Sequence, residues 1–69
     1  MRTWERQGYI VKEVPFDFSL NEFEVIKGNE RVAVITPGSI EDMEAIISDL
    51  DAGHDVNGWE DGMGNTISI

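Results

Sequence analysis

The residues from Ser39 to Gly53 predict an amphipathic helix, and in a chain of 69 residues that helix limits what else can form. Ser39 is a favourable N-cap, and Asp42 stands three residues later, where the acid of a capping box belongs. Apolar side chains then recur at helical spacing: Ile40, Met43, Ile46, Ile47 and Leu50. Gly53 follows the last of them and is a natural helix terminator. We therefore expect a helix over residues 40–51 whose apolar stripe must be covered by a sheet.

The stretch 22–36 predicts a β-hairpin. Two runs rich in β-forming residues, FEVIK and RVAVIT, flank Gly28-Asn29, a pair that tolerates positive φ. With this pair as the loop, the cross-strand partners are Lys27 with Glu30, Val25 with Val32, and Phe23 with Val34. We expect the helix to cover the face that carries the four apolar members of these pairs, Phe23, Val25, Val32 and Val34. The opposite face is then mixed and carries Glu24, Ile26, Arg31, Ala33 and Ile35.

Three further segments bear on the sheet. Residues 8–14, GYIVKEV, are rich in β-formers, and Pro15 lacks a ladder donor, so a central strand should stop there or sit at an edge. Residues 16–20 alternate with period two and fit either a continued strand or a loop that drops Phe16 and Phe18 onto the core. The tail, residues 65–69, alternates again and fits a short strand. The expected fold is α+β: one domain over residues 1–69, with a three- or four-stranded, mostly antiparallel sheet packed by one helix.

The charge balance excludes several classes of partner. The chain has 14 acidic and 5 basic residues, with a formal net charge of −9. This argues against direct binding of nucleic acid through phosphates, which needs clustered Lys and Arg, and against docking on an anionic membrane. The absence of cysteine fits a cytosolic protein, and no stretch approaches the roughly 18 apolar residues of a membrane span. The N-terminal residues lack the continuous apolar region of a secretion signal, so we expect a cytoplasmic protein.

The acids are unevenly distributed. All five cations lie within the first 31 residues, while residues 32–69 carry eight acids and no Lys or Arg. Acids in the first turns of the helix complement its dipole, but acids at its C-terminal end oppose it. Such a conflict with local folding physics is where function tends to lie. The candidate partner-binding residues are therefore Asp49, Asp51, Asp55, Trp59, Glu60 and Asp61. The plainer alternatives are a solvated acidic face that promotes solubility and a Trp59 ring that closes the core.

Metal and enzyme chemistry are weakly supported. Asp49, Asp51, Asp55, Asn57 and Glu60 echo the spacing of an EF-hand loop, but Gly53 and His54 occupy the positions that require Asp or Asn and then glycine. His54 is the only histidine, and Gly62-x-Gly64 lacks the lysine and the context of a phosphate-binding loop. We expect no catalytic residues, no metal and no cofactor.

The segment that contains IEDMEAIISDL and GWEDGMGNT resembles small acidic proteins encoded by phages and prophages of Gram-positive bacteria. This resemblance covers about the last 30 residues, from Ile40 onward. The layout is also similar to small anti-CRISPR inhibitors of Cas9, in architecture and charge only. Together with the acids that have no counter-charge, these resemblances favour a non-catalytic, phage-type accessory protein that binds a basic surface of a host protein. One form of this is inhibition of a nucleic-acid-binding enzyme, of the anti-CRISPR or anti-restriction type, by DNA mimicry.

The alternative function is structural. A small assembly protein would form a homo-oligomer through the second sheet face, at Ile26, Ala33 and Ile35. The sequence leaves the oligomeric state open.

Overall fold

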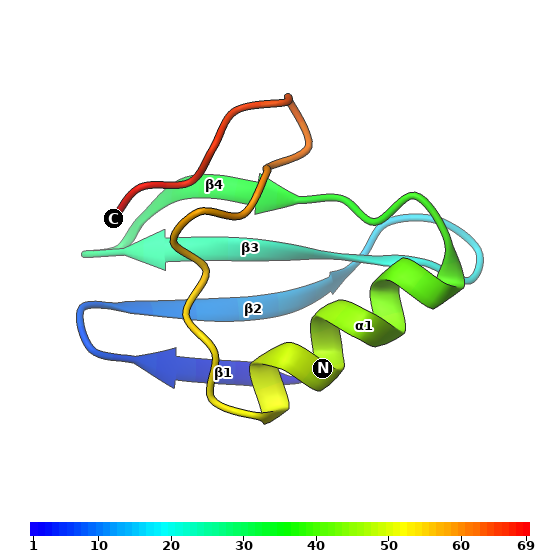
Figure 1. Ribbon diagram of the computed structural model, residues 1–69, viewed down its shortest axis with the longest axis horizontal. Helices are drawn as coiled ribbons and strands as arrows, with labels where there is room; N and C mark the ends of the chain where they lie inside the picture. Colours follow the sequence, from blue (N-terminus) through cyan, green and yellow to red (C-terminus); the bar gives the residue numbers. More distant parts are fainter.

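Four antiparallel strands, adjacent in space in the same order as in the sequence, form one open sheet with a single helix beside it (Figure 1). The computed structural model describes all 69 residues. The elements are β1 (Thr3–Arg6), β2 (Tyr9–Pro15), β3 (Asn21–Lys27), β4 (Glu30–Ile35) and α1 (Ile40–Asp51). The α+β class predicted from the sequence is confirmed, and the helix has the predicted bounds.

The fourth strand comes from the N-terminus, in a segment for which the sequence had predicted no strand. β1 is short, and Gly8 with a φ of 92° forms the turn that folds it back along β2. Trp4 pairs with Val11 in this hairpin, and its ring lies 5.9 Å from that of Phe23 between centroids. Aromatic burial therefore fixes β1 to the sheet, although its four residues show little of the alternation from which strands are recognised.

The two segments that the sequence left open contain no strand. Residues 16–20 form a loop in which the N–H groups of Phe16 and Asp17 both donate to the Leu20 carbonyl. Phe18 is fully exposed at this loop rather than dropped onto the core. The tail adds no strand either, because its only ladder contact is an isolated bridge between Glu60 and Thr66.

The predicted register of the β3–β4 hairpin holds next to the turn and fails beyond it. Lys27 pairs with Glu30 and Ile26 with Arg31, as that register requires, but Val25 pairs with Ala33 instead of Val32, so Val32 is an extra residue at a β-bulge. The remaining pairs are Glu24 with Val34 and Phe23 with Ile35. Because side chains alternate between the two faces, this single insertion exchanges the two faces of β4 beyond the bulge. Ala33 and Ile35 therefore face the core, and Val32 is 43% exposed.

Both helix ends have the predicted caps. The Ser39 hydroxyl accepts a hydrogen bond from the Asp42 N–H at 3.1 Å. At the other end Gly53 adopts a φ of 89°, its N–H donates to the Leu50 carbonyl, and the His54 N–H donates to the Asp49 carbonyl. This pair of bonds is a Schellman motif, which requires a left-handed residue at the position of Gly53. The helix has 12 residues and is neither long nor apolar enough to cross a membrane.

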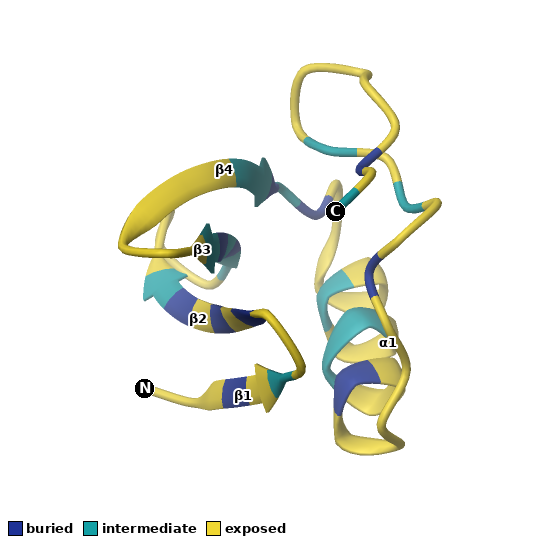
Figure 2. Ribbon diagram, turned by 90° about the vertical axis from the view of Figure 1, so that its left-hand side faces the viewer, coloured by how far each residue is buried: buried dark blue, intermediate teal, exposed yellow.

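The core lies between the sheet, α1 and the C-terminal segment, residues 52–69. Its buried apolar residues are Trp4, Tyr9, Val11, Phe23, Val25, Ile35, Leu50, Val56 and Ile67. The C-terminal segment is attached to the sheet at both ends: the Tyr9 hydroxyl accepts from the Val56 N–H at 3.1 Å, and the Gly62 N–H donates to the Val34 carbonyl at 2.7 Å. Figure 2 shows α1 and this segment on the same side of the sheet, with no element covering the other face.

Candidate functional site

Trp59 is held in place by the backbone of the C-terminal segment. Its N–H donates to the Val56 carbonyl at 3.1 Å, and its carbonyl accepts from the Ile67 N–H at 2.7 Å. Gly58, with a φ of 89°, supplies the turn that precedes it. The indole is half-buried and packs against the core. Trp59 therefore belongs both to the edge of the core and to the surface. One part of the ring closes the core, and the rest lines a surface groove.

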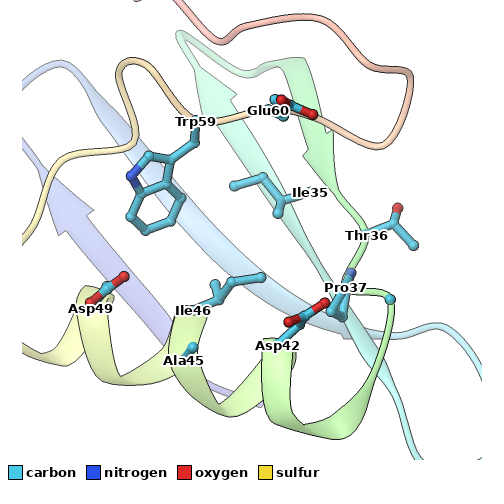
Figure 3. A pocket seen from close by; sticks show the side chains of 10 residues that line it. Ile35, Thr36, Pro37, Asp42, Ala45, Ile46, Asp49, Trp59 and Glu60 are labelled. Atoms are coloured by element: carbon cyan, nitrogen blue, oxygen red, sulfur yellow. The ribbon is translucent and has the colours of Figure 1, made fainter.

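This Trp59 groove is an open depression of about 390 Å³ between α1, the end of β4 and the C-terminal segment. Its lining residues are Ile35, Thr36, Pro37, Gly38, Asp42, Ala45, Ile46, Asp49, Trp59 and Glu60. Figure 3 shows Trp59 above the helix, with the Ile35 side chain between the indole and Pro37. The floor is therefore apolar and aromatic.

Three carboxylates form the rim of the groove, and no Lys or Arg lines it. Asp42 and Asp49 lie seven residues apart on one face of α1, which separates them by about 10 Å along the helix axis. Glu60 approaches from the C-terminal segment, next to Trp59. All three are exposed. An aromatic and aliphatic floor beneath carboxylates suits the stem of an Arg or Lys side chain, with its charge held over the ring and between the acids.

The structure brings three of the six predicted partner-binding residues together at this groove. Asp49, Trp59 and Glu60 all line it. Asp49 also lies 3.6 Å from His54 Nδ1, with more than half of each side chain exposed. This contact leaves the Asp49 carboxylate accessible to solvent and to a partner.

The other three predicted residues carry hydrogen bonds that support the fold. Asp51 accepts from Trp4 Nε1 at 2.8 Å, Asp55 from the Asn57 N–H at 2.8 Å, and Asp61 from the N–H groups of Met63 and Asn65 at 2.9 Å each. The last two are turns in which a carboxylate satisfies the backbone just after it. These roles give each acid a structural reason to be present, and none of the three lines the Trp59 groove.

Arg6 supplies the cation that the sequence near the end of α1 lacks. Its guanidinium donates to the carbonyl of Leu50, in the last helical turn, and to the carbonyl of His54, just beyond the helix, so a positive charge lies at the negative end of the helix dipole. The counter-charge that local sequence did not supply thus arrives from β1, 44 residues away. The acids near the helix end are therefore less anomalous than the sequence indicates.

Asp42 is the rim residue that the sequence reasoning missed, because capping and the helix dipole already explained it. Its carboxylate is not bonded to the Ser39 N–H, as a complete capping box would require, and it lines the groove instead. The available signal was spacing: residues 42, 45, 46 and 49 fall on one helix face and carry an acid, two apolar residues and an acid.

No group of three or more His, Asp or Glu side chains is placed to hold a metal ion. No family model, curated protein or solved structure matches this chain.

Proposed function

We propose that this is a non-catalytic binding protein whose Trp59 groove receives a basic side chain from the surface of a partner protein. The observation that carries this proposal is the combination of an indole and aliphatic floor with three exposed carboxylates and no cation on the rim. A cation that leaves water for such a site gains both ring contact and charge-assisted hydrogen bonds. Trp59 is also the kind of residue that dominates binding energy at protein interfaces.

The charge of the surrounding surface supports the same proposal. Residues 39–69 contain eight acids and no Lys or Arg, and the Arg6 guanidinium that reaches this side is bonded to backbone carbonyls. A partner with a basic surface would therefore be steered towards α1 and the C-terminal segment. Such attraction speeds association at low salt, whereas the contacts in the groove determine how long the complex lasts.

A nucleic-acid-binding protein of the host cell fits this description of the partner. Its phosphate-binding surface is basic, and carboxylates presented by a folded protein can occupy the places of phosphates. We propose that the protein is a cytoplasmic accessory protein of the phage type that competes with nucleic acid for such a surface. Inhibition of a defence enzyme, as in anti-CRISPR or anti-restriction proteins, is one form of this function.

The proposal is tested by affinity capture from a bacterial lysate with two charge variants and one groove variant. Asp49→Lys/Glu60→Lys changes two rim acids, and Glu30→Lys/Glu44→Lys changes two exposed acids outside the groove. Both variants raise the formal net charge of −9 by four units, two for each replacement, so they differ only in where the charge changes. Trp59→Phe keeps an aromatic ring against the core but makes the aromatic floor of the groove smaller.

We expect wild type and the Glu30→Lys/Glu44→Lys control to retain a basic nucleic-acid-binding protein that added DNA releases. The Asp49→Lys/Glu60→Lys variant should lose it, and Trp59→Phe should retain less. Circular dichroism checks that each variant is folded. Equal retention by the two charge variants would show that only total charge matters and would overturn the groove as the binding site.

A further inference from the structure

The sheet face opposite α1 is uncovered and carries aliphatic side chains between charged ones. We call it the open sheet face. Its aliphatic residues are Ile10, Val14, Ile26, Val32 and Val34, all exposed or half-buried. Figure 2 shows no helix or strand on this side of the sheet. Apolar side chains grouped on an uncovered sheet mark an interaction surface more often than scattered ones do.

The charges on this face follow the strand register. Along one row of neighbouring residues, Glu5 pairs with Ile10, Ile10 with Ile26, and Ile26 with Arg31. In the next row Lys12 pairs with Glu24, whose carboxylate also lies 3.1 Å from the Arg31 guanidinium of the same chain. The midline of the sheet runs between β2 and β3. In the first row the acid, Glu5, lies on the β1 side of this line and the cation, Arg31, on the β4 side. In the second row the cation, Lys12, lies on β2 and the acid, Glu24, on β3.

We propose that a second copy of this chain packs on the open sheet face, related by a two-fold axis that runs parallel to the strands between β2 and β3. This rotation lays β2 over β3 of the second copy, and β1 over its β4. Ile10 then meets Ile26 of the other copy, Lys12 meets Glu24, and Glu5 meets Arg31. Every contact occurs twice, as a two-fold interface requires. Sheets that pack face to face stay within about 30° of alignment, which keeps these opposite charges neighbours.

The balance of charge over the molecule also favours a second copy on this face. At a net charge of −9, two copies repel each other at most approaches. The open sheet face carries two of the five cations, Lys12 and Arg31, against three acids, Glu5, Glu22 and Glu24. Its apolar row and near-neutral, self-complementary charges make it the surface on which like molecules can meet. The inference does not rest on the proposed function, since the Trp59 groove lies on the other side of the sheet and stays accessible.

Sedimentation of the full chain tests the dimer. We expect the 7.7 kDa chain to associate reversibly to twice its mass between roughly 5 μM and roughly 500 μM, the range in which a small interface forms. Lys12→Glu and Glu24→Lys should each weaken association by about tenfold or more, because each places like charges in contact twice. Lys27→Glu and Glu44→Lys make the same charge changes outside the face and should leave the dissociation constant within about twofold.

The decisive sample is an equal mixture of the Lys12→Glu and Glu24→Lys variants. The first variant carries glutamate at both positions, 12 and 24, and the second carries lysine at both. In a mixed dimer, position 12 of each chain meets position 24 of the other, so a glutamate faces a lysine at both contacts. We expect the mixture to dimerise with nearly the wild-type dissociation constant. Within each variant monomer residues 12 and 24 carry like charges, and Glu24→Lys also loses the ion pair with Arg31. Mixing changes neither of these, so restored association can come only from contacts between chains.

Two results would overturn the proposal. One is a wild-type chain that remains a monomer at the highest concentration. The other is a mixture that associates no more strongly than either variant alone, which would place any dimer contact on another surface.

Discussion

Arg6 shows at the scale of one residue why the acidic end of the helix is stable. The guanidinium adds a donor to the Leu50 carbonyl in the last helical turn, binds the His54 carbonyl just beyond the helix, and places a positive charge at the negative end of the dipole. Two other hydrogen bonds join the same region to residues far away in the sequence. Trp4 Nε1 donates to the Asp51 carboxylate, and the Val56 N–H donates to the Tyr9 hydroxyl. The N-terminal hairpin therefore fixes the acidic half of the chain.

Replacing Arg6 by Gln should lower the free energy of unfolding by about 1–2 kcal/mol, because the Leu50 and His54 carbonyls lose a charge-assisted donor and the helix dipole loses a nearby cation. Urea denaturation measures this difference. Lys27→Gln removes one positive charge at an exposed site and should change stability by about 0.5 kcal/mol or less. Equal losses in the two variants would mean that Arg6 contributes only its charge to the whole protein, not a local cap.

These residue-level contacts could not be predicted from the sequence. Arg6 lies 44 residues from Leu50, and Trp4 lies 47 residues from Asp51. The residues next to the helix end in the sequence are acidic and include no cation, so local spacing alone cannot indicate these contacts. The six residues singled out for partner binding therefore combine those that line the groove with those that serve the fold, and only the tertiary contacts separate the two groups.

At the scale of elements, the helix was predictable and the hairpin register was not. Ser39, the apolar stripe and Gly53 are local signals that agree with one another, which is why residues 40–51 were assigned correctly. In β4, alternate residues offer two apolar sets, Val32 with Val34 and Ala33 with Ile35. Local pattern cannot choose between them, because either set fits the period of a strand. The bulge at Val32 and packing on the core decide the choice.

A matched pair of substitutions tests this register. Val25 is fully buried, whereas Val32 is 43% exposed. Val25→Thr should lower the free energy of unfolding by about 1–3 kcal/mol, because it buries a hydroxyl without a partner in nearly the same shape. Val32→Thr should change it by about 0.5 kcal/mol or less. If β4 had the register without a bulge, the two residues would face each other in the core, and both substitutions would cost the same in urea denaturation.

At the scale of the whole molecule, the sheet separates two different surfaces. The side of α1 and the C-terminal segment is acidic and contains the Trp59 groove, while the open sheet face is nearly balanced in charge. The asymmetry of charge was visible in the sequence, because every cation lies in the first 31 residues. The groove was not, because it forms where α1, β4 and the C-terminal segment meet.

The central claim is that the Trp59 groove, rather than acidity in general, binds cations on a partner. The most direct measurement uses Trp4→Phe protein, in which Trp59 is the only remaining tryptophan, with folding checked by circular dichroism. Its fluorescence is titrated with a short Arg-containing peptide and with the same peptide carrying Gln in place of Arg. We predict a saturable change with the Arg peptide alone, weakening several-fold between roughly 50 mM and roughly 200 mM salt.

Two charge variants in the same background complete the measurement. Glu30→Lys/Glu44→Lys should bind the Arg peptide within about twofold of the parent, whereas Asp49→Lys/Glu60→Lys should bind it at least about tenfold more weakly. Equal weakening in both variants, or peptide binding that leaves Trp59 fluorescence unchanged, would contradict the account.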